Sequence, residues 1–234
     1  MSTWNTIVEE VKASISDADG IAYYRGHSDS AWQLRPSLAR VKEKDIEYFE
    51  PTLYYSFITE AGSLLPITNS SWDNIYAMQH HGLPTRLLDW SESFSVALYF
   101  ALEKAEKEAV VWILNPYKLN EEATNNKALY DTSALKGNYE DYFISRTVKM
   151  EGDVIALSPL RHHPRIFNQK CGFTIHNNSV PLEELHPNAL KKIIITKDAF
   201  VDARMFLIMS GVNEFSLFPD LDGLARKIKK DEEI

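Results

Sequence analysis

The stretch QHHGLPTRLLDWSESFSVALYFA, residues 79–101, joins a helix end, a polar elbow and a new apolar helix. Gly82 follows a periodic apolar run and Pro84 forbids its continuation, so the first helix is expected to end near His81. Ser93 is expected to cap the second helix, whose apolar residues recur at i, i+3, i+4 and i+7. The stretch therefore predicts two helices joined by an elbow.

The elbow, Leu83 to Trp90, is unusually apolar for a solvated loop. It should be packed down, with the charges of Arg86 and Asp89 buried and paired to each other or to a ligand. The free N–H groups at the start of the following helix, with the hydroxyls of Ser91 and Ser93, could hold an anion or a polar ligand. This is where we expect the functional site.

Composition excludes several classes of protein. The net charge of −8 argues against sequence-independent binding to duplex DNA, although a nucleotide ligand remains open. The single Cys171 fits a reducing compartment, and the first residues carry no signal-peptide pattern. The longest apolar run, within Phe94–Leu102, is too short to span a bilayer. We expect a cytoplasmic protein with no membrane association.

Short strands interleaved irregularly with helices predict a single compact α+β domain of mixed or antiparallel strands. Helical spacing and caps predict helices over residues 3–14, 37–65 with a break near Pro51, 72–81, 93–105, 198–209 and 221–229. Strands are expected over residues 21–25, 109–114, 154–157, 172–176 and 191–196. The expected organisation is an N-terminal helix (1–20) packed on one domain (21–230), with a surface insertion at 117–150.

Four groups of residues carry a family resemblance. Tyr-Tyr-Arg-Gly at Tyr23–Gly26 is followed by Trp32, Leu34, Pro36, Ser37 and Arg40, then by the block Met78–Trp90, the element Pro164–Phe173 and the tail Leu217–Ala225. In this order they resemble the FRG family, named for its Phe/Tyr-Arg-Gly motif, over residues 21–228. Ile58 and Thr59 depart from the basic residues that this family often has there.

Arg25 at an early strand, Ser91-Glu92-Ser93 before an apolar helix and a late acidic residue are together similar, more distantly, to the Arg-Ser-Glu arrangement of ADP-ribosyltransferases. In that family an Arg on an early strand holds the dinucleotide phosphates, a Ser element orders the nicotinamide pocket, and a Glu bonds the ribose hydroxyl. The resemblance implies these roles for Arg25, Ser91 and Glu214. A fixed carboxylate would stabilise positive charge that develops on the ribose. Other acidic residues compete with Glu214 for that role, and they are Asp89, Glu92, Asp220 and Asp222.

Metal and thiol chemistry are disfavoured by the pattern. His80–His81 and His162–His163 are adjacent pairs whose side chains diverge on a helix, and no zinc-ligand spacing is present. Cys171 is interpreted as a small core residue. Gln169 could bond a base or amide group, or could cap the following strand. We therefore expect no metal.

The leading hypothesis is an ADP-ribosyltransferase-like or NAD-binding effector in a toxin or phage-defence setting, acting on a protein or nucleic-acid target. The alternatives are a non-catalytic ligand- or protein-binding module, and a nucleotide-processing or nuclease-like enzyme that uses Asp89 and His80. The expected catalytic residues are Glu214, Arg25 and Ser91, and NAD is the expected cofactor. The expected ligand-binding residues are Tyr24, Gly26, Gln79, His80, His81, Arg86, Asp89, Trp90, Ser93, Arg165 and Gln169.

Overall fold

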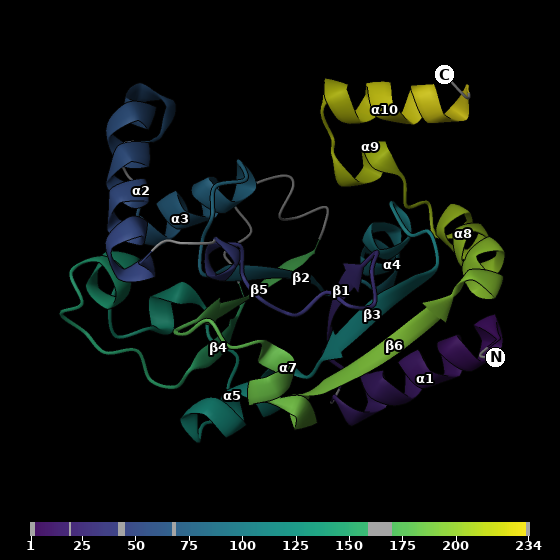
Figure 1. Ribbon diagram of the computed structural model, residues 1–234, viewed down its shortest axis with the longest axis horizontal. Helices are drawn as coiled ribbons and strands as arrows, with labels where there is room; N and C mark the ends of the chain where they lie inside the picture. The colour runs from purple at the N-terminus through teal and green to yellow at the C-terminus, as the bar shows by residue number, and fades with distance from the viewer. Residues whose placement is uncertain (1–2, 19, 42–44, 67–68, 159–169, 233–234) are drawn as a thin grey trace.

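The centre of the protein is a six-stranded sheet in the order β4-β5-β2-β1-β3-β6, antiparallel throughout (Figure 1). The computed structural model describes residues 3–18, 20–41, 45–66, 69–158 and 170–232. The strands are β1 (Tyr23–His27), β2 (Leu87–Ser91), β3 (Glu108–Leu114), β4 (Val154–Leu157), β5 (Cys171–His176) and β6 (Leu190–Thr196).

Helices cover both faces of this sheet. They are α1 (Trp4–Asp17), α2 (Ile46–Ala61), α3 (Ser71–His80), α4 (Phe94–Leu102), α5 (Pro116–Thr124), α7 (Leu182–Leu185), α8 (Phe200–Met209), α9 (Glu214–Leu217) and α10 (Leu221–Asp231). Short 3₁₀ turns lie at Leu38–Arg40, Gly62–Leu64, Thr132–Ala134, Pro187–Ala189 and Lys197–Ala199, and Glu140–Ile144 forms a π-helical turn. The predicted compact α+β domain is confirmed.

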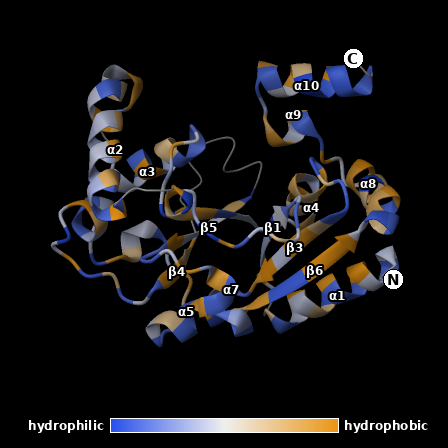
Figure 2. Cartoon of the chain, viewed as in Figure 1, coloured by the Kyte–Doolittle hydropathy of each residue, from blue (hydrophilic) through white to orange (hydrophobic). Residues whose placement is uncertain are grey.

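One face of the sheet is covered by two separate groups of helices. Helices α1, α4 and α8 pack on β1, β3 and β6, where Tyr24, Val111 and Ile193 are buried. Helices α2 and α3, with residues 139–150, pack on β2, β4 and β5 around Leu87 and Phe173. Figure 1 shows these groups at opposite ends of the molecule, and Figure 2 shows apolar residues along β3 and β6. The strands between the two groups, β1 and β2, form the middle of that face.

The opposite face forms a third apolar cluster. Tyr23, Leu88, Trp90 and Trp112 point to this side because neighbouring residues of a strand alternate between faces. Among the residues that the structure describes, none of the helices has both the length and the apolar character needed to cross a membrane.

The predicted break at Pro51 is wrong, because α2 runs straight through it. A proline lacks the N–H that would bond the carbonyl of residue i−4, here Glu47. Arg146 takes over that role: its Nη2 donates to the Glu47 carbonyl oxygen at 3.2 Å, and its Nη1 bonds the Glu47 carboxylate at 2.7 Å. A neighbouring segment therefore satisfies the carbonyl that Pro51 leaves without a partner.

The helix that precedes the elbow has the predicted ends. Ser70 and Asp73 form a capping box at the start of α3. At its end Gly82 has a positive φ of 81°, and the N–H of Leu83 bonds the carbonyl of Met78 at 2.9 Å. That bond satisfies a carbonyl of the last turn, so the helix ends where the glycine stands.

The elbow itself differs from its prediction. Leu87 to Ser91 form β2, an inner strand paired with β5 along its whole length and with β1 at Ser91. The apolar residues that made the loop unusual are those of a buried strand. Leu87 faces one side of the sheet and Leu88 and Trp90 face the other.

Residues 117–150, expected as a surface insertion, contribute to the core. Leu119, Asn120, Tyr139 and Phe143 are all buried. The Asn120 amide donates to the carbonyl of Ala156 and accepts from its N–H, so it extends the edge of β4 as a strand residue would. Because its buried residues fall in two short groups, near positions 119 and 139–143, the segment lacks the sustained periodicity by which sequence reasoning recognises a core element.

Candidate functional site

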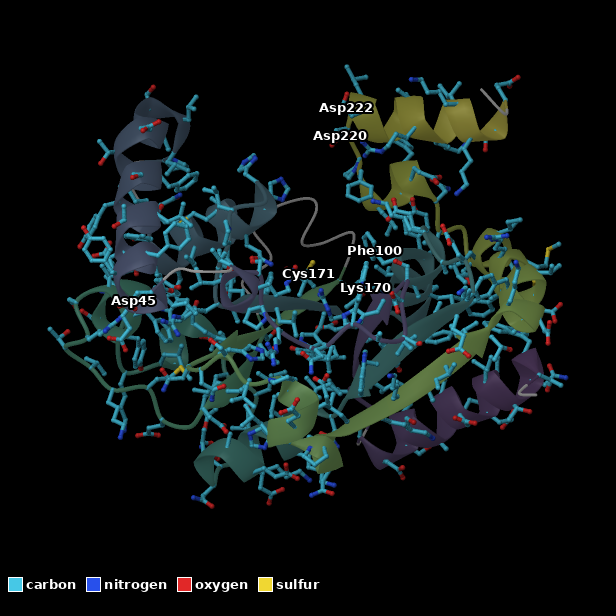
Figure 3. The ribbon with its side chains drawn as sticks, viewed as in Figure 1. Asp45, Phe100, Lys170, Cys171, Asp220 and Asp222 are labelled. Carbon is cyan, nitrogen blue, oxygen red and sulfur yellow. The ribbon has the colours of Figure 1, made fainter. Side chains whose placement is uncertain are left out.

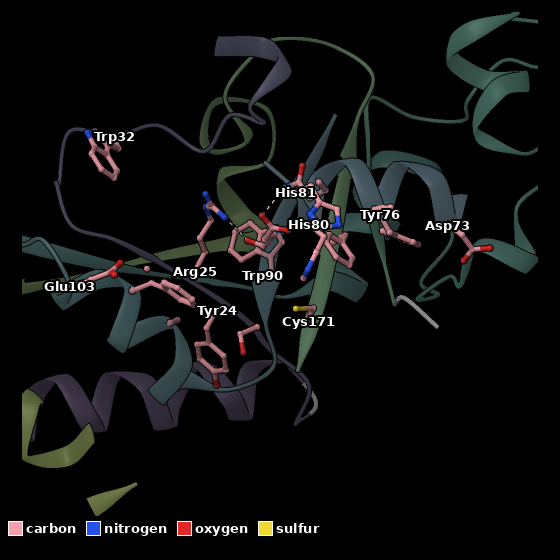
Figure 4. Close-up of a pocket in the computed structure, with 18 of the residues that line it drawn as sticks. Tyr24, Arg25, Trp32, Asp73, Tyr76, His80, His81, Trp90, Glu103 and Cys171 are labelled. Atoms are coloured by element: carbon pink, nitrogen blue, oxygen red, sulfur yellow. Dashed lines mark hydrogen bonds between the residues drawn. The ribbon is translucent and has the colours of Figure 1, made fainter. Parts of the chain in front are cut away.

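A cavity of about 690 Å³ lies over β1 and β2, where the two groups of helices leave the sheet uncovered. Helix α3 forms one wall and α4 the other, while the strands supply the floor. Figure 4 shows Trp32 and Glu103 on one side of Arg25, and His80, Tyr76 and Asp73 on the other. The volume is typical of a small-molecule site.

The floor of the cavity is a split between two strands. The β1–β2 ladder pairs Tyr24 with Ser91 and goes no further within these described strands, whereas β1 pairs with β3 along its whole length. The guanidinium of Arg25 fills the split, and its Nη1 donates to the carbonyl oxygen of Asp89 at 2.7 Å. If the β1–β2 ladder continued, the carbonyl oxygen of Asp89 would accept a hydrogen bond from a backbone N–H of β1. Here it accepts from the Arg25 side chain instead.

Arg25 is held by neutral acceptors. Its Nε donates to Nε2 of His27 at 3.1 Å, so two of the five N–H groups of the guanidinium bond described residues. Among the described residues no carboxylate lies within ion-pair distance of Arg25. Burial lowers its pKa, and the negative charge of Asp89 opposes that shift. Arg25 is thus a half-buried cation at the wall of the cavity, and three of its donors bond no described residue.

His27 is neutral, which fixes its hydrogen-bonding pattern. Burial and the positive charge of Arg25 lower the pKa of His27 to about 3. Because Arg25 can only donate, Nε2 of His27 accepts, and the proton sits on Nδ1 facing the carbonyl oxygen of Trp32 at 3.3 Å. The imidazole therefore orients Arg25 without adding a positive charge.

Gly26 is required by close packing of α4. A Cβ at this position would lie 1.9 Å from the carbonyl oxygen of Ala97 and 2.6 Å from the nitrogen of Ala101. The Arg-Gly pair thus has two functions: the glycine brings α4 down onto β1, and the arginine next to it faces the cavity that α4 bounds.

Asp89 brings a carboxylate to the same place. The residue is exposed, and its Oδ2 accepts from Nε2 of Gln79 at 2.7 Å. Gln79 is itself fixed, because its Oε1 accepts from the hydroxyl of Thr85. The cavity thus presents a cation and an oriented carboxylate side by side.

Aromatic rings line the other walls. Tyr76 of α3 and Phe173 of β5 have ring centroids 5.0 Å apart, and Trp32 stands at the opposite end. Burial raises the pKa of Tyr24 to about 12, so its phenol stays protonated at neutral pH. Flat apolar walls beside a half-buried cation suit a planar ring that carries an anionic group.

Nine of the residues predicted from the sequence line this cavity, and they are Tyr24, Arg25, Gly26, Gln79, His80, His81, Asp89, Trp90 and Ser91. Arg165 and Gln169 lie outside the described residues, as do His162 and His163. Three further predicted residues, Arg86, Ser93 and Glu214, do not line the cavity.

Arg86 has a structural role. It forms a two-pronged ion pair with the buried Glu50 of α2, with Nε and Nη2 each 2.7 Å from Oε2, and its guanidinium lies over the ring of Phe143. The expectation that Arg86 and Asp89 are both buried is wrong for Asp89, which is exposed and bonds Gln79, whereas the largely buried Arg86 bonds Glu50.

Glu214 and Ser93 also serve local structure. Glu214 is buried at the start of α9, where its Oε1 accepts from Lys230 at 2.6 Å. Asp220 caps α10 through the N–H of Gly223, and Figure 3 shows Asp220 and Asp222 well apart from Cys171 at the cavity. Ser93 occupies the N-cap of α4 but bonds Ser95 rather than the helix N–H groups. The C-terminal tail is therefore no wall of this cavity.

Other lining residues were not predicted as site residues. On α3, Asp73, Tyr76 and Ala77 share one face with the predicted His80, at i, i+3, i+4 and i+7, a signal that was present in the sequence. Cys171 and Phe173 lie directly opposite Ser91 and Asp89 on β5, which required knowledge of the strand register. Nothing in the sequence indicated that Glu103, at the end of α4, would line the cavity.

Comparison with protein families matches residues 20–109 to the FRG domain. Neither the curated proteins nor the solved structures contain a match to the chain. The matched segment includes β1, α3, β2 and α4, which supply Arg25, Gln79 and Asp89 and both helical walls of the cavity. The later motifs, at Pro164–Phe173 and Leu217–Ala225, lie beyond it. The comparison thus supports the FRG resemblance for residues 20–109.

Proposed function

We propose that the cavity binds a nucleotide or dinucleotide of the NAD class, with a phosphate on Arg25. The observation that carries this proposal is Arg25 itself. A half-buried guanidinium that two neutral acceptors hold among the described residues keeps three of its five N–H donors for a ligand. Removing a cation from water even in part without a counter-charge is costly, and an anionic ligand would offset that cost.

The rest of the cavity supports the same ligand class. The rings of Tyr76 and Phe173 offer an apolar surface to a base. Asp89 and Ser91 place oxygen acceptors where ribose hydroxyls could reach them. The volume of about 690 Å³ is large enough for more than a mononucleotide.

Titration of the protein with NAD tests this proposal. Wild type is expected to bind, and Arg25→Lys to bind at least tenfold more weakly, because an ammonium cannot reproduce the planar fork of donors. Isothermal calorimetry with NAD and ADP-ribose measures both affinities.

The matched control is Arg204→Lys on α8, an arginine that stacks on Phe200 and does not line the cavity. It should bind as wild type does. If wild type and Arg25→Lys bound NAD with equal affinity, at unchanged melting temperature, Arg25 would not be a ligand-binding residue.

A second candidate function, ADP-ribosyl transfer, is favoured by Asp89. When the bond between nicotinamide and ribose breaks, the electron pair leaves with nicotinamide and positive charge grows on the ribose. Asp89 is a carboxylate inside the cavity beside Arg25, whereas Glu214 lies outside it. We therefore assign the charge-stabilising role to Asp89, with a protein or nucleic-acid acceptor or water receiving the ribosyl group.

Release of nicotinamide from NAD tests this second function. Asp89→Asn keeps the shape and loses the charge, so turnover should fall ~100-fold. Glu214→Gln should retain turnover within about twofold, because Glu214 bonds Lys230 and does not line the cavity. If Glu214→Gln lost more turnover than Asp89→Asn, the charge-stabilising role would return to Glu214. If wild type bound NAD but did not turn it over, even with lysate added as acceptor, the result would favour a non-catalytic ligand-binding module.

A further inference from the structure

Trp32 is a large aromatic residue that lies outside the core and at one end of the cavity. It is 54% exposed and belongs to none of the three apolar clusters of the described residues. Its ring meets that of His27 edge-on, with centroids 6.0 Å apart, and an edge contact of this kind leaves the flat face of the indole uncovered. Trp32 thus adds an open aromatic surface to the lining of the cavity.

The loop that carries Trp32 is held in place by hydrogen bonds. Within the loop, the N–H of Ala31 donates to Oδ1 of Asp29 at 2.9 Å and the N–H of Trp32 to the Asp29 carbonyl at 3.3 Å. From β6, Nζ of Lys192 donates to the carbonyl of Ser30 at 2.8 Å. The exposed indole is therefore carried on a fixed backbone, and a preorganised surface of this kind binds with little loss of conformational entropy.

The cation of the site lies between Trp32 and a second aromatic surface. His27 connects Trp32 to Arg25, because its Nδ1 donates to the Trp32 carbonyl at 3.3 Å and its Nε2 accepts from Arg25 at 3.1 Å. The tilted ring pair of Tyr76 and Phe173 also lines the cavity, and Figure 4 shows Trp32 and Tyr76 on opposite sides of Arg25. The cavity thus has an aromatic surface at each end and a guanidinium between them.

We infer that the cavity takes ligands in which two planar rings are joined by an anionic linker, and that Trp32 is the specificity-determining residue that holds the second ring. This inference rests on the proposed nucleotide site and deepens it, because it selects dinucleotides over ligands with one base. The linker lies on Arg25. The first ring takes the more enclosed surface, that of Tyr76 and the buried Phe173, and a second ring is needed to use Trp32.

Two probes of equal charge isolate the second ring. Diadenosine diphosphate and ADP-ribose share one adenine and the pyrophosphate diester, and only diadenosine diphosphate carries a second adenine. Calorimetry on wild type should show diadenosine diphosphate binding about tenfold more tightly, the effect of stacking one base on an aromatic ring. Trp32→Ala should abolish that advantage and change ADP-ribose binding less than about twofold, because His27 bonds the backbone of Trp32 and still orients Arg25.

Two further variants make the result specific. Trp32→Phe keeps an aromatic face and should retain most of the preference for diadenosine diphosphate. Tyr55→Ala on α2 is the matched control: Tyr55 is also 54% exposed and also makes an edge contact, with Tyr54, but it does not line the cavity. It should leave both affinities as in wild type.

The outcomes separate this inference from the function on which it rests. If wild type binds neither probe, the nucleotide site is refuted and this inference with it. If wild type binds both probes equally, the site stands and has no place for a second ring. If Trp32→Ala keeps the preference, or loses both probes in parallel at unchanged melting temperature, the role of Trp32 is wrong. A selective loss of diadenosine diphosphate, with the preference retained by Trp32→Phe, supports both.

Discussion

Replacing Glu50 by Gln is expected to lower the free energy of unfolding by about 3–5 kcal/mol. Glu50 is buried and accepts from both Arg86 and the hydroxyl of Tyr139. Burial alone would lower the pKa of Arg86, but the Glu50 carboxylate outweighs it and the pKa is raised. The neutral amide leaves Arg86 buried without a counter-charge, and a buried unpaired charge is what destabilises the fold. Urea denaturation measures the change.

The comparison that makes this result specific is Asp89→Asn. Asp89 is exposed, so removing its charge should cost less than about 1 kcal/mol. Replacing both members of the buried pair, as Glu50→Leu with Arg86→Met, should recover much of the stability, because no unpaired charge remains. Equal effects of Glu50→Gln and Asp89→Asn would show that the buried pair does not anchor α2 to the sheet.

Replacing Gly26 by Ala is expected to cost about 3 kcal/mol and to open the cavity wall. The added methyl would overlap the carbonyl oxygen of Ala97, and backbone atoms cannot yield as a side chain can, so α4 must move away from β1. Thermal unfolding measures the stability, and the near-UV circular dichroism of the aromatic residues reports the movement.

Gly20→Ala is the matched control. Gly20 has a φ of 83° with open space around its Cβ position, so an alanine there meets backbone strain alone, about 1 kcal/mol. If Gly26→Ala were no more destabilising than Gly20→Ala, the close approach of α4 to β1 would not be what requires the glycine.

Local chemistry explains which elements were predictable from the sequence. Ser70 and Asp73 form the capping box that their spacing predicts, and Gly82 ends α3. Val154–Leu157 is a strand with the predicted bounds. In each case the signal and its structural consequence lie within a few residues of one another.

The misinterpreted features depend on partners distant in sequence. The elbow is a strand because β5, more than eighty positions later, pairs with it. Pro51 is tolerated because Arg146 reaches the carbonyl of Glu47. The partner of Arg86 is Glu50, on a helix that the sequence gives no reason to place there. Motif order identified most of the cavity, but whether Glu214 faces it depended on packing that no local pattern encodes.

The central claim is that the cavity over the β1–β2 split binds a nucleotide through Arg25, and a crystal structure of the protein grown with saturating NAD tests it most directly. The claim predicts density for NAD between α3 and α4, with a phosphate within hydrogen-bond distance of the Arg25 guanidinium and a ribose hydroxyl at Asp89. Density for NAD elsewhere on the protein, or an unoccupied cavity at saturating NAD, would contradict it.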